Sequence, residues 1–576
     1  MSNDRATATA NYRMNILAFC LTFACAVLIG QLFRYQVVDH DALENEAKAQ
    51  RLWEKEIPPR RGYVADANGH LLALSEIEWE IAVSPALVFH PKELAPELAE
   101  LLGQSQDEVY AQLTSGKPWV QLATNVEYQT GEAIADLHDP GLICTPHPRR
   151  LYPEGALFAH IVGFVNDTGD GFYGVEGYYN QLLQGVPGKQ RVVQNPVGRE
   201  LPIPPLEYTP PQPGTSLILT VDRNLQYIAW EELQRSLETY GAESGTIIVM
   251  NPRNGAILAA VSSPAYDPND FDKVDTDLLA DPSVSKMWEP GSIFKIITWA
   301  AGLDSGTISP GTTFYDNGAL EVGGRVIRNW DRQGHGLVTM TGGLVQSLNT
   351  VAAFTSTSMG KDRFYTYLRR FGIGTLTKVD LASEGPGMIK LPGDSNWFPS
   401  ELGTNSFGQG IAVTPMQMIA GVSVVANEGI LIKPHVVDRF LATDQETGET
   451  RTLTVESMRV RRAISPQAAQ TLTDMLVQVI DQGATMAQVP GYRIAGKTGT
   501  AQIPTPYGYD PNDTIASFVG FAPADDPQFI ALIKLDRPTA SPWGSQTAAP
   551  TFKALAERLF VYMQIPPDDV RLAAQR

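Results

Sequence analysis

The sequence is poor in the residues from which disulfide frameworks and metal sites are built. It has 3 cysteines and 8 histidines among 576 residues. Cys20 and Cys25 lie in an apolar N-terminal run, which leaves Cys144 alone and excludes a disulfide-stapled scaffold. The histidines lack the spacing of zinc ligands, so no metal site is expected.

Clusters of positive charge are also missing from the sequence. Lysine and arginine total 44 against 63 aspartates and glutamates, which gives a net charge of -19. A phosphate backbone selects for clustered lysine and arginine side chains. We therefore expect no nucleic-acid partner.

Long uncharged runs are rare as well, and the one that is present lies near the N-terminus. The run "MNILAFCLTFACAVLIGQLF" begins at Met14 and is long enough to cross a hydrocarbon core. Its "ACA" segment resembles a signal-peptide cleavage site, but the apolar residues continue past it, which favours a retained anchor. Arg5 and Arg13 precede the run, which favours a cytoplasmic N-terminus. We predict a cytoplasmic tail at 1–13, a single membrane-spanning helix at 14–34 and an extracytoplasmic remainder attached to the cell membrane.

A proline-rich segment divides the remaining chain. Six prolines fall between Pro202 and Pro213, a density that marks a stiff linker or domain boundary. We predict a first domain over 35–205 and a second over 206–570. Within the first, residues 43–57 are predicted to form a helix that ends before Pro58.

The stretch "PGYRIAGKTGTAQIP" matches a phosphate-binding loop from Gly491 to Thr498, with Lys497 in the lysine position. Such a loop needs a helix that starts at the lysine. Pro504 and Pro506 fall within the first turns of that helix, and proline breaks its hydrogen bonds. We therefore predict a strand around Lys497 and exclude a nucleotide site.

Three short motifs instead suggest covalent catalysis. Ser292 and Lys295 are about one helical turn apart, so their side chains share a face, and a lysine with a depressed pKa can activate a serine. Taken alone, this pair reads as an ordinary helix start with a solvated lysine. Ser347 and Asn349 form an S-x-N pair, and Lys497 begins K-T-G. The three motifs, in this order, are the set of penicillin-binding proteins and class A β-lactamases.

With these motifs the chain resembles the class B penicillin-binding proteins, the monofunctional DD-transpeptidases of cell-wall synthesis. The segment "RRGYVADANGHLLA" is similar to that class's R-G-x-I-x-D-R-N-G motif and departs from it at Ala67. "RRLYPEGALFAHIVGFV" and "GFYGVEGYYN" also look like class motifs, and we interpret all three as holding a non-catalytic pedestal together. The resemblance implies an α+β transpeptidase domain, with an antiparallel sheet flanked by helices, and an elongated, β-rich pedestal. Ser292 is expected at a helix start and Lys497 on an edge strand.

The resemblance also implies roles for the motif residues. Ser292 would attack the carbonyl between the two terminal D-alanines of a peptidoglycan stem peptide, and Lys295 would accept its proton. Ser347 would relay a proton to the leaving amine near Lys497, and Asn349 would hold Lys295 and the substrate amide.

Substrate binding is assigned by the same resemblance to Thr498, Gly499 and Thr500. The two threonine hydroxyls, with Lys497, would receive the terminal carboxylate. The resemblance implies that no cofactor or metal is needed. The backbone N–H groups of Ser292 and Thr500 would form the oxyanion hole. The implied partners are peptidoglycan stem peptides, β-lactam antibiotics as covalent inhibitors and a polytopic membrane glycosyltransferase.

Two other functions share part of this pattern. A serine β-lactamase has the same motifs and uses a glutamate to position water, for which Glu401 and Asn405 offer a pair, although such pairs are common on helix faces. A penicillin-binding sensor or non-catalytic scaffold is the second alternative, because motifs do not report turnover.

Overall fold

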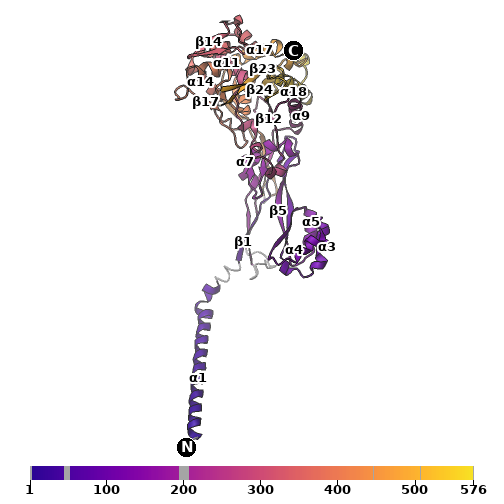
Figure 1. Cartoon of the computed structure of the whole chain (residues 1–576), viewed down its shortest axis with the longest axis vertical. Helices are drawn as coiled ribbons and strands as arrows, with labels where there is room; N and C mark the ends of the chain where they lie inside the picture. Colours follow the sequence, from indigo (N-terminus) through magenta and orange to yellow (C-terminus); the bar gives the residue numbers. More distant parts are fainter. Residues whose placement is uncertain (1–2, 45–51, 194–206, 445–446, 506–507, 575–576) are drawn as a thin grey trace. The chain divides into compact units, whose positions relative to one another are not determined.

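The computed structural model describes residues 3–44, 52–193, 207–444, 447–505 and 508–574, and Figure 1 labels its elements. These fall into two compact units. The first comprises residues 1–60 and 185–213, and the second comprises 61–184 and 214–576. The predicted boundary at residues 205 and 206 lies outside the described residues, so the predicted domain limits stay a prediction.

The first unit begins with a helix that is long and apolar enough to cross a membrane. Helix α1 (Asn3–Phe33) runs directly into the π-helical turn η1 (Arg34–Val38). The part of this helical segment that is long and apolar enough to span a bilayer is Asn11–Val38, and its side chains are exposed. It contains the predicted membrane segment at 14–34.

A three-stranded sheet completes the first unit, with β8 (Gly188–Val193) between β1 (Leu52–Ile57) and β9 (Glu207–Thr209). The helix predicted over 43–57 is therefore wrong at its C-terminal end, and its residues 45–51 lie outside the described ones. Leucine, glutamate and lysine favour a helix locally. Pairing along the whole of β1, from Leu52 opposite Val193 to Ile57 opposite Gly188, overrides that preference.

A seven-stranded sheet in the second unit draws strands from both halves of the sequence. Its strands are β2 (Val64–Ala65), β3 (Leu71–Val83), β4 (Val120–Val126), β5 (Leu142–Leu151), β10 (Ser216–Leu219), β20 (Val437–Thr443) and β21 (Thr450–Thr454). Helices α3 (Pro91–Leu102), α4 (Gln106–Leu113) and α5 (Tyr128–Ala135) belong to a separate small core with β3 and β4. The α+β character predicted from the sequence is confirmed.

The sheet that carries one of the motifs has five antiparallel strands in the order β12-β11-β25-β24-β23. They are β11 (Ser244–Met250), β12 (Ile257–Ser263), β23 (Ala495–Thr505), β24 (Gly508–Ala522) and β25 (Phe529–Asp536). Lys497 lies on β23 at the sheet edge, as predicted. The strand predicted around Lys497 is confirmed, whereas a phosphate-binding loop needs a helix that starts at the lysine.

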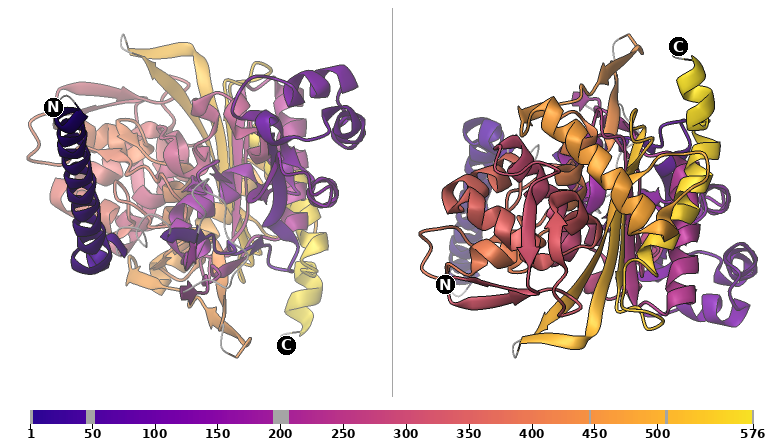
Figure 2. Two further views of the ribbon diagram at one scale, coloured as in Figure 1. Left: turned by 90° about the horizontal axis from the view of Figure 1, so that it is seen from below. Right: turned by 90° about the horizontal axis from the view of Figure 1, so that it is seen from above.

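Helices cover both faces of this sheet (Figure 2, right). On one face lie α9 (Arg223–Tyr240) and α18 (Ala548–Tyr562); on the other lie α11 (Lys295–Asp304), α16 (Pro415–Ala426) and α17 (Pro466–Gln482). Alternate residues of β25 enter the two cores, Ile533 on the first face and Leu532 on the second.

The three N-terminal motifs meet at one buried carboxylate, that of Glu176. Arg61 Nε donates to Glu176 Oε2 at 2.8 Å, and Arg150 Nε donates to Glu176 Oε1 at 2.7 Å. Glu176 is fully buried. Because a buried charge is tolerated when it is paired and hydrogen-bonded, this network gives the motifs a structural role.

Candidate active site

Ser292 lies where a tight turn passes into a long buried helix. It belongs to the 3-10 turn η6 (Gly291–Phe294), which continues directly into α11. Gly291 has a positive φ of 57°, and a Cβ there would lie 3.0 Å from the Thr500 carbonyl oxygen. Glycine is therefore required both for the turn and for the close approach of η6 to β23. The prediction that Ser292 stands at a helix start is confirmed.

Lys295 is completely buried on the first turn of α11. Its Nζ donates to the Ser347 carbonyl oxygen at 2.6 Å and lies 3.2 Å from the Ser347 hydroxyl. It also donates to Asn349 Oδ1 at 2.8 Å. The S-x-x-K and S-x-N motifs are thus joined through one amine.

The S-x-N segment is held in an uncommon backbone conformation. It links α12 (Met340–Val345) to α13 (Asn349–Met359), and Ser347 has a φ of 56°. Asn349 Nδ2 donates to the Arg328 carbonyl oxygen at 3.1 Å, which fixes the amide that faces Lys295. A non-glycine residue at positive φ costs free energy and is frequent at functional sites, where the surroundings enforce it.

The third motif lies on β23, directly against η6. Lys497 is 1% exposed, and its Nζ donates to the Thr498 carbonyl oxygen at 3.2 Å. A Cβ at Gly499 would lie 2.4 Å from Ser517 Oγ and 3.0 Å from Ile293 Cγ2, so this strand approaches η6 only because position 499 is glycine. The Thr500 hydroxyl accepts from the Gly544 N–H at 3.1 Å.

Burial lowers the pKa values of both lysines, and that of Lys295 is lowered further by its neighbour. Burial and then the positive charge of Lys497 hold the pKa of Lys295 well below its ordinary value. Burial lowers the pKa of Lys497 to about 7. This shift favours the neutral form of the Lys295 amine, the form that activation of a neighbouring serine requires.

Two tryptophans that the sequence analysis missed lie beside this site. The rings of Trp330 and Trp543 meet edge to face with centroids 5.4 Å apart, and Trp330 Nε1 donates to the Gln346 carbonyl oxygen at 3.2 Å. Trp330 thus adjoins the S-x-N segment, and Trp543 adjoins Gly544, the partner of Thr500. No local pattern connects residues so distant in sequence.

Glu401 and Asn405, the pair considered for a β-lactamase, already have partners. Lys390 Nζ lies 2.6 Å from Glu401 Oε1. Asn405 Nδ2 donates to the Tyr365 hydroxyl at 2.9 Å. Nothing in these contacts directs Glu401 toward a water beside Ser292.

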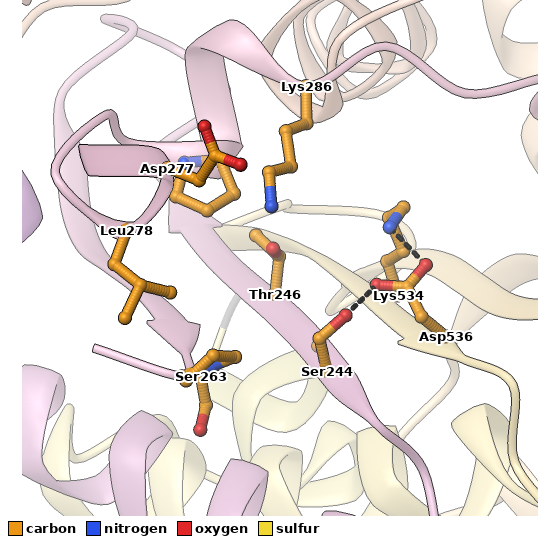
Figure 3. Close-up of a pocket in the computed structure, with 11 residues that line it drawn as sticks. Ser244, Thr246, Ser263, Asp277, Leu278, Lys286, Lys534 and Asp536 are labelled. Carbon is orange, nitrogen blue, oxygen red and sulfur yellow. Dashed lines mark hydrogen bonds and ion pairs between the residues drawn. The ribbon is translucent and has the colours of Figure 1, made fainter. Parts of the chain in front are cut away.

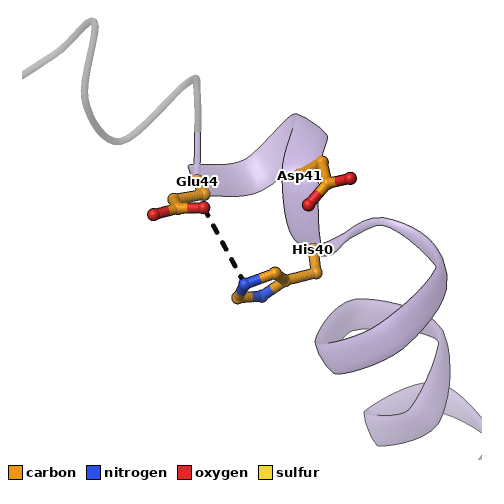
Figure 4. A group of neighbouring side chains, drawn as sticks. All are labelled: His40, Asp41 and Glu44. Atoms are coloured by element: carbon orange, nitrogen blue, oxygen red, sulfur yellow. Dashed lines mark ion pairs between the residues drawn. The ribbon is translucent and has the colours of Figure 1, made fainter.

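Two further groups of polar side chains, one lining a small cavity and one after η1, are explained by pairing among their own members. A cavity of about 30 Å³, the size of one water, lies at the end of the sheet beside Lys534 (Figure 3). Its Asp536 pairs with Lys534 and accepts from the Ser244 hydroxyl at 2.6 Å. His40, Asp41 and Glu44 lie close together after η1, but all three are exposed and His40 simply pairs with Glu44 at 3.8 Å (Figure 4).

Comparison with known proteins gives matches over both halves of the chain. Residues 245–557 match the family model of the penicillin binding protein transpeptidase domain, and 56–219 match that of the penicillin-binding protein dimerisation domain. The chain is 33% identical over 547 residues to stage V sporulation protein D of Bacillus subtilis, covering 93% of this chain and 83% of that protein. It is 28% identical over 568 residues to peptidoglycan D,D-transpeptidase FtsI of Escherichia coli, covering 97% of this chain and 93% of that protein.

A solved structure agrees with this likeness. Penicillin binding protein 3 of Mycobacterium tuberculosis, complexed with aztreonam, has a TM-score of 0.68 and 26% sequence identity. The match covers 89% of this chain and 98% of that one.

Proposed function

The chain belongs to the class B penicillin-binding proteins, and from this membership and the site geometry we propose that it is a serine-type peptidoglycan D,D-transpeptidase. The observation that carries the proposal is the buried Lys295 amine. It donates hydrogen bonds to the Ser347 carbonyl oxygen and to Asn349 Oδ1, and its pKa lies well below the ordinary value for lysine. A base of this kind is what a serine nucleophile needs.

In the first half-reaction, the Ser292 hydroxyl attacks the carbonyl carbon between the two terminal D-alanines of a stem peptide. Its proton passes to the neutral Lys295 amine while the C–O bond forms. The C–N bond then breaks, and Ser347, bonded to Lys295, relays a proton to the leaving D-alanine amine. Lys497 lies near this relay and supports it by its charge.

The oxyanion that develops on the carbonyl would be stabilised by the backbone N–H groups of Ser292 and Thr500. The close packing of Gly291 against the Thr500 backbone supports this placement, because it brings the two segments side by side. Lys497, Thr498 and Thr500 would hold the substrate's terminal carboxylate, with the Gly499 backbone between them. Asn349 would orient the substrate amide.

In the second half-reaction, an amine of a neighbouring stem peptide attacks the Ser292 ester. A new amide C–N bond forms as the ester C–O bond breaks, and the proton of the attacking amine passes through Lys295 to the serine oxygen. No metal or cofactor takes part in this scheme. β-Lactams, which imitate the substrate carbonyl, would acylate the same serine and remain attached.

The protein is membrane-anchored, and we place its N-terminus in the cytoplasm and its transpeptidase domain outside. A polytopic glycosyltransferase in the same membrane is the partner we propose, met through the anchor and the pedestal, because crosslinking needs freshly polymerised glycan strands. We propose 35–205 as the pedestal and 206–570 as the transpeptidase domain.

Mass spectrometry of the intact protein after exposure to penicillin G tests the reaction class. We expect one covalent adduct that maps to Ser292 and persists, that is absent from Ser292→Ala, and that is retained in Ser305→Ala, at the end of the same helix. An adduct that is released within seconds would instead identify a β-lactamase. Replacement of the cellular copy by Ser292→Ala separates an enzyme from a scaffold, because a scaffold alone would still support growth.

A further inference from the structure

A groove on the second unit, away from the catalytic motifs, combines an apolar floor with a positively charged rim. Its cavity of about 140 Å³ lies between α16, β19 (Ile430–Ile432) and β22 (Arg459–Arg462). Among the apolar residues that line it are Phe371, Leu376, Leu431, Met458 and Val460.

Part of this apolar lining reaches the surface. Leu376 is 47% exposed, Met458 58% and Val460 38%. Pockets for drug-sized ligands measure about 300–1,000 Å³, so this smaller cavity suits one large apolar side chain. The exposed hydrophobic residues around its mouth are the kind of patch that marks an interaction site.

The rim of the groove is unusually basic for a chain of net charge -19. Lys378, Lys433 and Arg461 line the cavity itself. Four more arginines lie on the adjoining segments: Arg369, Arg370, Arg459 and Arg462. Among the residues the structure describes, none of these seven cations lies within 4.0 Å of a carboxylate oxygen. Three of these arginines, Arg459, Arg461 and Arg462, form a short basic cluster in the sequence that was overlooked. The other members come from separate segments, and only the fold brings them together.

The rim is also held in place by its own contacts. Lys378 has a φ of 62°, and its N–H donates to Glu384 Oε2 at 2.9 Å. The other Glu384 oxygen accepts from the Thr377 N–H at 2.6 Å, so this carboxylate binds the backbone, and Lys378 itself is exposed. Arg461 Nη1 donates to the Arg369 carbonyl oxygen at 2.9 Å. A strained backbone that side chains enforce is typical of a binding or switch segment.

Charges on an edge strand can also serve to prevent aggregation, as arginines along β22 would. That role explains Arg459 and Arg462, but it requires neither an apolar cavity nor the lysines contributed by other segments. A sugar polymer offers no compact apolar group to fill such a cavity, and a lipid surface meets a protein over a flat area. A peptide supplies both kinds of group at the right spacing.

We propose that this groove binds an acidic peptide segment of a partner protein. One large apolar side chain of the segment fills the cavity, and carboxylates on either side of it pair with Lys378, Lys433 and Arg461. Charge complementarity gives the specificity, and the apolar side chain supplies the anchor that a surface ion pair lacks. The groove is separate from the transpeptidase motifs, so binding there does not depend on the proposed reaction.

Fluorescence anisotropy with the full-length protein in detergent tests the proposal. The probe is a fluorescein-labelled heptapeptide with one central phenylalanine between two runs of three acidic residues. We expect saturable binding that weakens roughly tenfold or more in Lys378→Glu/Lys433→Glu, because like charges replace attractive pairs. Lys273→Glu, an exposed lysine elsewhere, should bind as the wild type does.

Two further binding measurements distinguish an apolar peptide side chain from other ligands of the groove. A probe with alanine in place of phenylalanine should bind roughly tenfold more weakly, since it leaves the cavity empty. Equal binding of the two probes, or of the wild type and the double variant, would overturn the proposal. Phosphatidylglycerol vesicles that displace the peptide and bind more tightly than it does would also overturn it, in favour of a lipid.

Folding of the variants is checked separately. Acylation by fluorescent penicillin should be retained in the double variant, because the groove lies outside the catalytic motifs. If that variant does not fold, Lys433→Gln and a titration from about 50 to 300 mM salt replace it, and binding that is unchanged by both contradicts the proposal.

Discussion

At the residue scale, Lys295 is proposed to act as a base in its neutral form, and not through a positive charge. Arginine keeps the positive charge but does not lose its proton in proteins. Lys295→Arg should therefore lower the rate of acylation by fluorescent penicillin about 100-fold or more, the range expected when a general base is removed. Lys553→Arg, at a partly exposed lysine on α18, is the control. An unchanged rate in Lys295→Arg would refute the role of base.

Burial of the Lys497 side chain should lower the free energy of unfolding at low pH, where its amine is protonated. Its pKa is about 7 in the folded protein and about 10.5 when exposed, so between these values the unfolded chain binds a proton that the folded chain does not. The free energy of unfolding therefore rises with pH across this window, and the full cost of a buried ammonium is present below it. Lys497→Met should raise the midpoint of thermal unfolding, and by more at pH about 6 than at pH about 9.

Differential scanning fluorimetry of both proteins at the two pH values measures this effect. The same variant should lose penicillin acylation, because the charge beside the relay is gone. If Lys497→Met raised the midpoint of thermal unfolding equally at both pH values, side-chain packing, and not burial of charge, would account for the higher stability of the variant.

At the element scale, the contact between η6 and the later segment that ends at Gly408 depends on glycine. Gly408 is in the left-handed conformation with φ 79°, and a Cβ there would lie 2.4 Å from the Gly291 carbonyl oxygen. Gly408→Ala should displace the segment that carries Ser292 and lower both acylation and stability.

Gly103 offers a matched control for this substitution. It also ends a helix in the left-handed conformation, with φ 63°, but no atom lies within 4 Å of its Cβ position. Gly103→Ala should cost only the conformational penalty of about 1–2 kcal/mol and leave acylation unchanged. Equal loss of acylation in the two variants would contradict a local effect on η6.

The Arg61, Glu176 and Arg150 network should be a large contributor to the stability of the second unit. Glu176→Gln removes the charge that neutralises two buried guanidinium groups, so we expect a loss of about 3–5 kcal/mol in the free energy of unfolding. Glu243→Gln, whose partner Arg537 is on the surface, should cost less than about 1 kcal/mol. Urea denaturation followed by intrinsic fluorescence compares them.

Much of the site could be predicted from the sequence because each motif is local. Ser292 and Lys295 are one turn apart, and the prolines after Lys497 exclude a helix there. What brings them together is not local: Lys295 bonds to residues 52 and 54 positions away. The strand β1 was misassigned for the same reason, since its partner β8 decides its conformation. Trp330 and Trp543 meet only through tertiary contacts, and only the fold brings the arginines of β22 beside the lysines of the groove.

At the scale of the whole molecule, the proposed orientation across the membrane has a direct chemical test. Ala8 precedes the anchor and Thr450 lies on the exposed strand β21. Cysteine is introduced at each position in a Cys144→Ser background, because Cys144 is a free and only partly buried thiol whose own labelling would obscure the result. In spheroplasts, a membrane-impermeant maleimide should label Thr450→Cys at once and Ala8→Cys only after lysis. The reverse pattern would contradict the orientation, and loss of the residue 8 label from the mature protein would identify a cleaved signal peptide instead of an anchor.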